Sequence, residues 1–281
     1  MSPSKEESMQ SSNPVFTRSE EFNGRGRSGY ANFEQPGYGT PVTHSGAGTG
    51  RMTIDSVVQR TGATLGVVVL VAAITWVTTG KLVAADGLID TDVQSRLYAL
   101  AVVGSLGGFA LSMVNSFKRV VSPGLVLAYA AFEGLAIGAF SKAIGTAVGN
   151  GAVVGAVLGT IAAVAGTLTA YKVFDIQVTN KFRTWVIGMM FGFVAVTMLD
   201  FVLGLFHADL GFNGFGTLGV LMSIVGLGIG VLMLILDFDF VERGIAAGLP
   251  ERESWRAAFG LTVTIVWIYV ELLRLISIIR N

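Results

Sequence analysis

The sequence contains no cysteine and only two histidines in 281 residues. The lack of cysteine excludes disulfides, thiol catalysis and thiolate metal sites, and two histidines give poor support to zinc chemistry. Charged residues are also scarce, at 14%, whereas 52% of the residues are hydrophobic and the mean hydropathy is +0.66. This composition is typical of an integral membrane protein rather than a soluble globular one.

The charged residues are balanced, with 19 Lys and Arg against 19 Asp and Glu. Because the chain has no basic block, nothing in it predicts nucleic acid as a partner. The lipid bilayer is the partner that the composition does predict.

Residues 1–50 differ from the rest in being rich in Ser, Gly, Asn and Glu. They contain no apolar run of signal-peptide length, so we expect a disordered cytoplasmic tail without a cleavable signal. Tyr30, Phe33 and Tyr38 are candidate docking points for a membrane-protein partner, although the composition favours an unstructured, solvated tail. Residues 51–281 are predicted to form one membrane domain.

Apolar segments long enough to cross a bilayer recur from Gly62 onward, and no soluble domain separates them. A hydrocarbon core of about 30 Å takes about 20 helical residues. The sequence therefore predicts an all-α, polytopic integral membrane protein with seven transmembrane helices. The predicted spans are Gly62–Thr79, Leu97–Asn115, Leu125–Phe140, Gly151–Ala170, Trp185–Phe206, Thr217–Leu236 and Arg256–Ile279.

The distribution of Lys and Arg predicts the orientation, because cytoplasmic loops retain these residues. On the side of the N-terminus lie Arg51, Arg60, Lys118, Arg119, Lys172, Lys181, Arg183, Arg243, Arg252 and Arg256, whereas Lys81, Arg96, Lys142 and Arg280 lie opposite. We therefore expect the N-terminus in the cytoplasm and the C-terminus outside. The absence of organelle-retention and cleavable signals suits a bacterial plasma membrane.

Glycines at four-residue spacing recur in the predicted spans and let helix backbones approach closely. They are Gly151, Gly155 and Gly159, then Gly134 and Gly138, Gly188 and Gly192, and Gly226 and Gly230. Close packing within one bundle and a dimerisation face both explain this spacing, and packing is favoured because seven helices have many internal contacts to make.

The ionisable residues inside the predicted spans are the candidates for a functional site. They are Glu133, Asp200, Asp237, Asp239, Glu271 and Arg274. A charged group at the bilayer centre costs about 2.5–3.5 kcal/mol, so each of them needs a proton, a partner or water. None of the spans contains clustered histidines, so we expect no dedicated metal site.

Each candidate also has a structural explanation. Glu133 lies about 15 Å into its span, where a protonated, hydrogen-bonded glutamate that fixes helix packing is as good an interpretation as function. Asp200 and Glu271 are at similar depths, so they could share a polar cavity. Glu271 and Arg274 are three residues apart on one helical face and are expected to neutralise each other. Asp239 lies close to the cytoplasmic interface, where we expect it to be solvated.

Several motifs occur in an order that resembles the Bax inhibitor-1 (transmembrane Bax inhibitor motif) family. EGLAIG, Glu133 to Gly138, resembles the family signature in the third span. LILDFDFVERG at the end of the sixth span is similar to a family helix that ends in an aspartate, and IYVELLRLISIIR resembles the C-terminal helix. The lead-in MTIDSVVQRTG looks like a bacterial branch of the family, and the resemblance runs from about Met52 to Asn281.

The resemblance implies a bundle in which six helices surround a central seventh. For some bacterial members it also implies a pH-sensitive calcium leak, in which one aspartate on the sixth helix and one on the seventh share a proton and close the pore. Asp237 matches the first aspartate. Two alignments place either Glu271 or Thr264 at the second position.

Helix geometry favours one of these two alignments. If the sixth and seventh helices form an antiparallel hairpin that turns near Leu249 to Glu253, Asp237 lies opposite Thr264 or Ile265. Glu271 would then be about 10 Å farther along the axis. Since proton sharing requires two carboxylates in near contact, this geometry favours a departure from the paired-aspartate pattern.

Other functional classes fit the residues less well. A retinal-binding protein would have a mid-membrane lysine in its last span, and an intramembrane zinc hydrolase would have histidines in the spans, whereas His44 lies in the tail and His207 near the outer end of the fifth span. We therefore expect no enzyme and no cofactor. Our hypothesis is that Glu133, Asp237 and Glu271, with Arg274 as a counter-charge, line a cation path, with calcium as the transported ion that the resemblance implies. The alternatives are a proton- or cation-coupled transporter and a non-transporting regulator of a membrane protease or stress response.

Overall fold

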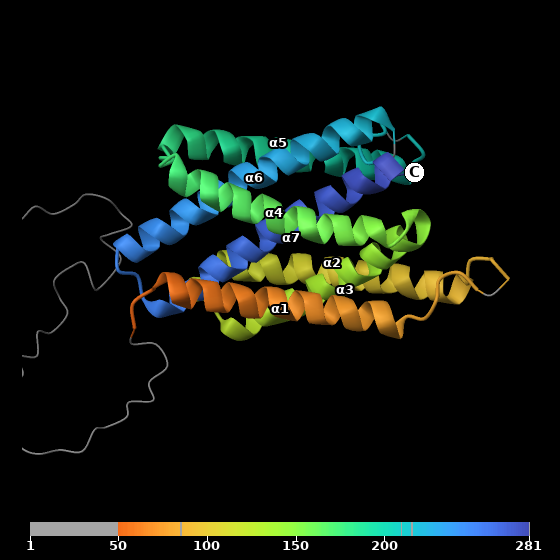
Figure 1. Ribbon diagram of the computed structural model, residues 1–281, viewed down its shortest axis with the longest axis horizontal. Helices are drawn as coiled ribbons and strands as arrows, with labels where there is room; N and C mark the ends of the chain where they lie inside the picture. Colours follow the sequence, from red (N-terminus) through yellow and green to blue (C-terminus); the bar gives the residue numbers. More distant parts are fainter. Residues whose placement is uncertain (1–49, 85, 209, 215, 281) are drawn as a thin grey trace, which may run out of the picture. The chain divides into compact units, whose positions relative to one another are not determined.

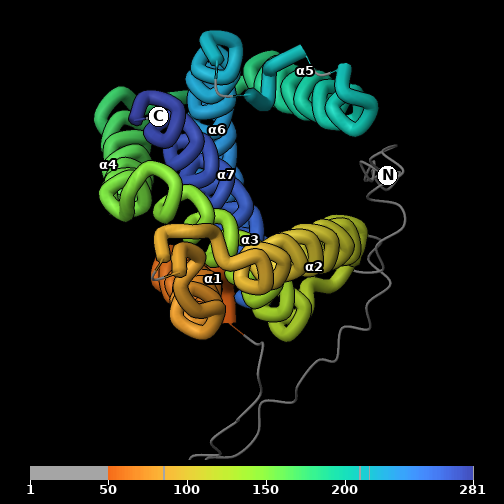
Figure 2. The backbone as a smooth tube through the Cα atoms, turned by 90° about the vertical axis from the view of Figure 1, so that its right-hand side faces the viewer, coloured from red at the N-terminus to blue at the C-terminus, as the bar shows by residue number. Residues whose placement is uncertain are grey.

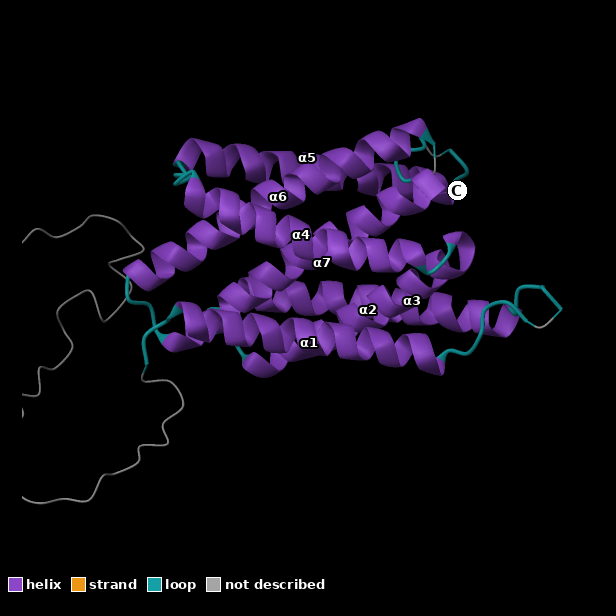
Figure 3. Ribbon diagram, in the orientation of Figure 1, coloured by secondary structure: helices purple, strands orange, loops and turns teal. Residues whose placement is uncertain are grey.

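The structure is a computed structural model that describes residues 50–84, 86–208, 210–214 and 216–280. The predicted tail, residues 1–50, lies outside these ranges except for Gly50. Every long element in the described part of the chain is a helix (Figure 3). The helices are α1 Ile54–Thr78, α2 Thr91–Phe117, α3 Pro123–Val148, α4 Gly151–Val173, α5 Asn180–Leu205, α6 Thr217–Ala246 and α7 Ser254–Arg280, and a short 3₁₀ helix, η1 Glu251–Glu253, precedes α7.

All seven long helices are apolar enough to cross a membrane, which confirms the predicted all-α, multi-pass fold. Several of them extend beyond the predicted spans. α1 begins at Ile54, eight residues before Gly62, because Thr53 and Ser56 form a capping box that satisfies its first backbone N–H groups. α6 continues ten residues past Leu236, because neighbouring side chains pair with the charged residues of its last turns.

Consecutive helices are joined by short connections and alternate in direction (Figure 1). α1, α3, α5 and α7 therefore begin at one end of the bundle, called the N-terminal end below. The contacts that hold this end together include a 2.8 Å hydrogen bond from Arg256 of α7 to the carbonyl oxygen of Arg119 and an ion pair between Arg60 of α1 and Glu251 of η1. The basic residues that predicted a cytoplasmic face gather on the loops and helix ends here.

α7 occupies the central position that the resemblance implied. It packs against α1, α3, α4 and α6, whereas α2 packs mainly against α3, and α5 mainly against α6. Figure 2 shows α7 between α6 and α3. Met52, just before α1, and residues of α1, α6 and α7 share the largest buried apolar cluster, which includes Val57, Leu234, Leu261 and Ile268.

The glycine pairs mostly mark close helix contacts inside the bundle. A Cβ on Gly138 of α3 would lie 2.6 Å from the carbonyl oxygen of Ala72 on α1, and one on Gly134 would lie 2.7 Å from that of Val68. Gly226 and Gly230 of α6 likewise face α7 side chains. In contrast, a Cβ on Gly188 or Gly192 of α5 would meet nothing within 4 Å. Gly151, Gly155 and Gly159 of α4 also face α7 side chains. Close packing within the bundle therefore explains three of the four sets of glycines.

Candidate functional site

Asp237 and Thr264 meet across the contact between α6 and α7. The Thr264 hydroxyl donates a hydrogen bond to Asp237 Oδ2 at 2.5 Å, and Thr264 is buried. The register predicted from an antiparallel hairpin is therefore confirmed, because Asp237 faces Thr264 and not Glu271. A hydroxyl occupies the place where the resemblance implied a second carboxylate, so this pair cannot share a proton as two carboxylates do.

Asp237 has no basic partner in the described part of the chain. No Lys, Arg or His nitrogen there lies within 4.0 Å of its carboxylate. Its second oxygen, Oδ1, lies 3.5 Å from the position that a Cβ on Gly260 of α7 would take. Nine residues separate Asp237 from the end of α6, which places it about 13 Å along the axis from the N-terminal end of the bundle. Asp237 is thus a carboxylate inside the bundle that is held by a neutral donor.

Asp239, two residues later on α6, has a different environment. It is only 5% exposed and accepts from Arg183 of α5 at 3.0 Å and from Arg243 of α6 at 2.8 Å. Arg243 also donates to the carbonyl oxygen of Val178 at 2.5 Å, which ties the connection between α4 and α5 to α6. The prediction that Asp239 is solvated is wrong, because its side chain is buried and pairs with two arginines.

Glu133 of α3 faces α2. Its Oε2 lies 3.0 Å from the position of a Cβ on Gly108 of α2, so the absence of a side chain at Gly108 makes room for the carboxyl group. Tyr129, one turn earlier, packs edge-on against Phe259 of α7 with ring centroids 5.0 Å apart. Since α3 and α7 run in the same direction, Glu133 and Thr264 lie at similar depths beyond this aromatic contact.

Glu271 and Arg274 do not form the ion pair that their spacing predicted. No ion pair within 4.0 Å joins them, and Arg274 donates instead to the carbonyl oxygen of Phe212 in the connection between α5 and α6. The two side chains therefore make no direct ion pair in the described structure, because a backbone carbonyl oxygen binds the guanidinium. Glu271 itself is buried against Gly226 of α6.

Asp200 of α5 also binds the connection between α5 and α6. It is 2% exposed and accepts from the backbone N–H groups of Leu210 at 2.6 Å and Asn213 at 2.7 Å. These bonds give the carboxylate a structural role in shaping the loop. The described contacts do not join Asp200 to Glu271 directly, but Arg274 holds Phe212 of the same loop.

The described contacts do not gather Glu133, Asp237 and Glu271 into one cluster. Each faces a different neighbour: Gly108 of α2, Thr264 of α7 and Gly226 of α6, respectively. Within the described ranges there is also no group of three or more His, Cys, Asp or Glu side chains arranged to hold a metal ion. The hypothesis that the three carboxylates line one path stays a prediction.

The buried lysine of α3 was not predicted from the sequence. Lys142 is 6% exposed and donates to the carbonyl oxygens of Trp76 and Gly80 and, at 2.8 Å, to the Thr79 hydroxyl. It caps the C-terminus of α1, where free carbonyl groups and the helix dipole stabilise a cation. The predicted third span ended at Phe140, so Lys142 was assigned to a connection, whereas α3 continues to Val148.

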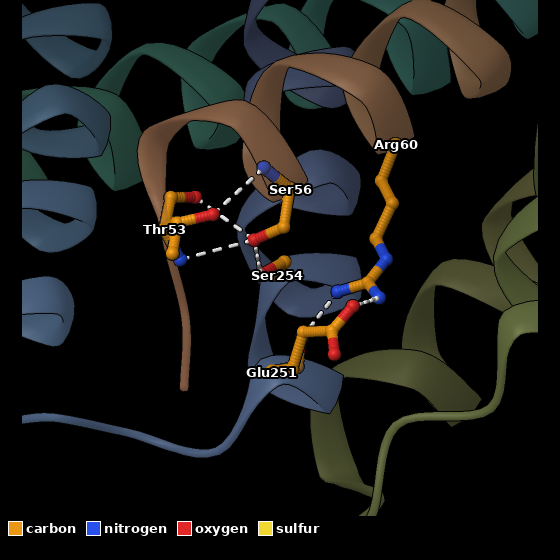
Figure 4. Close-up of polar contacts among 5 residues, drawn as sticks. All are labelled: Thr53, Ser56, Arg60, Glu251 and Ser254. Carbon is orange, nitrogen blue, oxygen red and sulfur yellow. Dashed lines mark hydrogen bonds and ion pairs between the residues drawn. The ribbon is translucent and has the colours of Figure 1, made fainter. Parts of the chain in front are cut away.

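A polar network at the start of α1 was also missed. Figure 4 shows Thr53, Ser56 and Arg60 facing Glu251 and Ser254, which begin η1 and α7. The Ser56 and Ser254 hydroxyl oxygens are 2.7 Å apart, and the Arg60 guanidinium contacts Glu251 Oε1 at 2.5 Å and its carbonyl oxygen. We call these five residues the N-terminal clasp. The partners are about 200 residues apart in sequence, so no local pattern could have found them.

The comparison with known families agrees with this architecture. A family model described as Bax inhibitor 1 like matches residues 13–281. The matched range begins at residue 13, whereas the sequence motifs indicated a resemblance only from about Met52 onward. No curated protein matches the chain. Because the family model covers nearly the whole sequence and the structure has the seven helices and central α7 that the motifs implied, the chain belongs to the Bax inhibitor 1-like family.

Proposed function

We propose that this protein is a cation leak in which Asp237 is the carboxylate that attracts the ion. The observation that carries the proposal is the contrast between Asp237 and Asp239. Two arginines neutralise Asp239, whereas Asp237 has only the Thr264 hydroxyl as a described partner. An intramembrane carboxylate without a basic partner favours a cation in its neighbourhood, and such residues mark ion pathways.

In this proposal, the hydrogen bond between Asp237 and Thr264 keeps the ion pathway closed. It joins α6 to the central α7, and Gly260 of α7 presents no side chain to the second carboxylate oxygen. Separation of the two helices at this level frees both carboxylate oxygens for a passing ion. Calcium is the proposed ion because hard oxygen ligands suit it and because the family resemblance implies it. Glu133, at a similar depth, is the next carboxylate that such an ion would meet.

The proposal places the protein in a bacterial plasma membrane, with the N-terminus in the cytoplasm and the C-terminus outside. Its support is the accumulation of Lys and Arg at the N-terminal end of the bundle, together with the lead-in motif MTIDSVVQRTG. In this orientation the clasp faces the cytoplasm. Arg280, the last residue of α7, faces the outside.

Calcium flux into liposomes tests the proposal. Purified protein is reconstituted into liposomes that contain a calcium-sensitive dye. The rate of calcium entry is then compared between the wild type, Asp237→Asn and Asp92→Asn. Asp92 lies exposed in the first turn of α2, so its substitution removes the same charge outside the bundle interior. We expect wild-type flux, a reduced flux for Asp237→Asn and no change for Asp92→Asn. Folded wild-type protein without flux contradicts the leak, and flux in exchange for protons points to a coupled transporter.

Regulation of a partner membrane protein is a second candidate, supported by how the chain enters the bundle. The Met52 N–H donates to the carbonyl oxygen of Leu249 at 2.7 Å, and the Glu251 N–H donates to that of Gly50 at 2.8 Å. Binding of a partner to residues 1–49 would therefore act on the connection between α6 and α7 through these two hydrogen bonds. Deletion of residues 1–49 separates the two candidates, since a regulator loses its cellular effect while a leak keeps its flux.

A further inference from the structure

A pocket of about 480 Å³ lies at the end of the bundle opposite the N-terminal clasp. Its walls come from the end of α1, the connection that follows it, the last turns of α3 and the residue before α4. Lys81 and Lys142 line this pocket, whereas no Asp or Glu side chain of the described residues does. We call it the lysine pocket. Its volume is in the range of small-molecule binding sites, and every charge on its walls is positive.

Lys142 supplies a fixed charge to this pocket. The side chain is 6% exposed, although it lines the pocket. Its ammonium group donates to the Trp76 carbonyl oxygen at 2.6 Å, to the Thr79 hydroxyl at 2.8 Å and to the Gly80 carbonyl oxygen. These acceptors and the dipole of α1, which is equivalent to about half an elementary charge, stabilise the ammonium group without carrying a full negative charge. No described carboxylate lies within 4.0 Å of it.

Lys81 adds a second positive charge that is exposed to solvent. It lies in the connection between α1 and α2 and makes no ion pair within 4.0 Å among the described residues. The nearby carboxylates of this connection bind backbone groups instead: Asp86 accepts from the Leu88 N–H, and Asp90 accepts from the Asp92 N–H. The positive charge of the lysine pocket is therefore not balanced by the described part of the chain.

A second pocket, of about 450 Å³, lies at the other end of α4 and differs in charge. There the basic residues occur together with acidic ones, and the charged lining residues are Lys172, Asp175, Asp239, Glu242 and Arg243. Arg243 pairs with Asp239 at 2.8 Å, so part of this charge is neutralised within the protein. An excess of positive charge is thus a particular property of the lysine pocket and not of both pockets.

The lysine pocket also has an apolar side at the level where α1 ends. Val77, in the last turn of α1, is 77% exposed, and Val83 is 40% exposed. Trp76 lies beside them, and tryptophan is common at the boundary between hydrocarbon and head groups. Asn150, which precedes α4, makes no capping bond through its side chain, so its amide is a further donor on the wall of the pocket. Cationic and amide donors therefore adjoin apolar side chains at this boundary.

We infer that the lysine pocket binds the head group of an anionic phospholipid. The phosphate group accepts from the exposed ammonium group of Lys81 and lies in the field of the buried Lys142, since lysine binds phosphate as a point charge. The exposed side chains of Val77 and Val83 contact the glycerol and acyl region. A zwitterionic head group fits less well, because the pocket offers no carboxylate to its cationic part. This inference does not rest on the proposed cation leak.

Native mass spectrometry of the purified protein in neutral detergent tests lipid binding. Phosphatidylglycerol and phosphatidylcholine with the same acyl chains are titrated, and the dissociation constants are compared. We expect phosphatidylglycerol to bind more tightly than phosphatidylcholine, and Lys81→Gln to weaken its binding about fivefold, the contribution of one basic residue near an anionic membrane surface. Lys172→Gln removes the same charge from the other pocket and should leave the binding unchanged. Equal affinities for the two lipids, or equal affinities of wild type and Lys81→Gln for phosphatidylglycerol, would overturn the inference.

Two further measurements test the fixed charge and the source of the phosphate. Lys142→Gln should weaken phosphatidylglycerol binding as well. If this variant does not fold, Thr146→Glu decides, because Thr146 is an exposed residue of the pocket and a carboxylate there should repel the head group. Unchanged binding in Thr146→Glu would contradict the site. Inorganic phosphate should not displace the lipid at equal concentration, and phosphate that binds as tightly as phosphatidylglycerol would refute the lipid as occupant. These measurements need no ion flux, so they remain decisive if the cation leak is refuted.

Discussion

Thr264 of α7 donates its hydroxyl hydrogen to Asp237 of α6 across 2.5 Å, at the level where the family resemblance implied two aspartates. The contact is therefore a bond between a carboxylate and a neutral donor. A threonine contributes no second titrating group, so the contact lacks the mutual repulsion that makes a pair of carboxylates separate as pH rises. Asp237 is then the one titrating group of this contact, and no partner carboxylate repels it as pH rises.

Thr264→Asp should create the missing carboxylate pair. Two carboxyl groups in this contact would share a proton at low pH and repel each other when it is lost. We therefore expect calcium flux in liposomes to rise more steeply with pH in Thr264→Asp than in the wild type. The same pH profile of calcium flux before and after the substitution would show that positions 237 and 264 do not meet in the membrane.

Asp239→Asn should destabilise the fold much more than Asp237→Asn. The first change leaves Arg183 and Arg243 without their buried carboxylate, and breaking a buried ion pair costs about 3–5 kcal/mol. Because both arginines are partly exposed, we expect the lower end of that range. Asp237→Asn keeps an oxygen that accepts from Thr264. Thermal unfolding in detergent compares the two variants, and equal losses would contradict the different roles of these aspartates.

Gly138→Ala and Gly188→Ala should have opposite effects on stability. The new methyl group at Gly138 would lie 2.6 Å from the Ala72 carbonyl oxygen, and such overpacking costs about 1–3 kcal/mol. At Gly188 the methyl group meets nothing within 4 Å, and helix propensity favours alanine by about 1 kcal/mol. Thermal unfolding of both variants measures the difference. A Gly188→Ala variant that is less stable than the wild type would reveal a packing partner on α5.

Cysteine labelling tests the orientation in the membrane. Leu88 is exposed in the connection between α1 and α2, and Gln177 is exposed in the connection between α4 and α5. A membrane-impermeant thiol reagent added to intact cells should modify Leu88→Cys, whereas Gln177→Cys should react only after lysis. The unsubstituted protein is the blank, since it has no cysteine. The reverse pattern would place the N-terminus outside.

The helices and the contact between α6 and α7 could be predicted from sequence because both depend on local quantities. Apolar length predicts a span, and the rise per residue predicts which residues meet across a tight hairpin. The position of Thr264 opposite Asp237 was reached in this way. Contacts of this kind can be predicted where the two residues lie on consecutive helices.

The environments of Asp239 and Glu271 could not be predicted, because their surroundings come from distant parts of the chain. Arg183 reaches Asp239 from α5, and Phe212 draws Arg274 away from Glu271 from a loop. One sequence gives the spacing of Glu271 and Arg274 but not the carbonyl oxygen that competes with their ion pair. The pairing of Arg60 with Glu251 in the N-terminal clasp could not be predicted either, because the two residues are distant in the sequence and no local pattern marks them.

Calcium flux through Thr264→Val in liposomes tests the central claim most directly. Valine keeps the shape of threonine and removes the donor that holds Asp237, whereas Thr264→Ser keeps the hydroxyl and serves as the control. We predict that Thr264→Val raises calcium flux several-fold above the wild type, that Thr264→Ser stays near it, and that adding Asp237→Asn to Thr264→Val abolishes the gain. Equal flux in all four proteins would show that the Asp237 and Thr264 contact does not close a cation path.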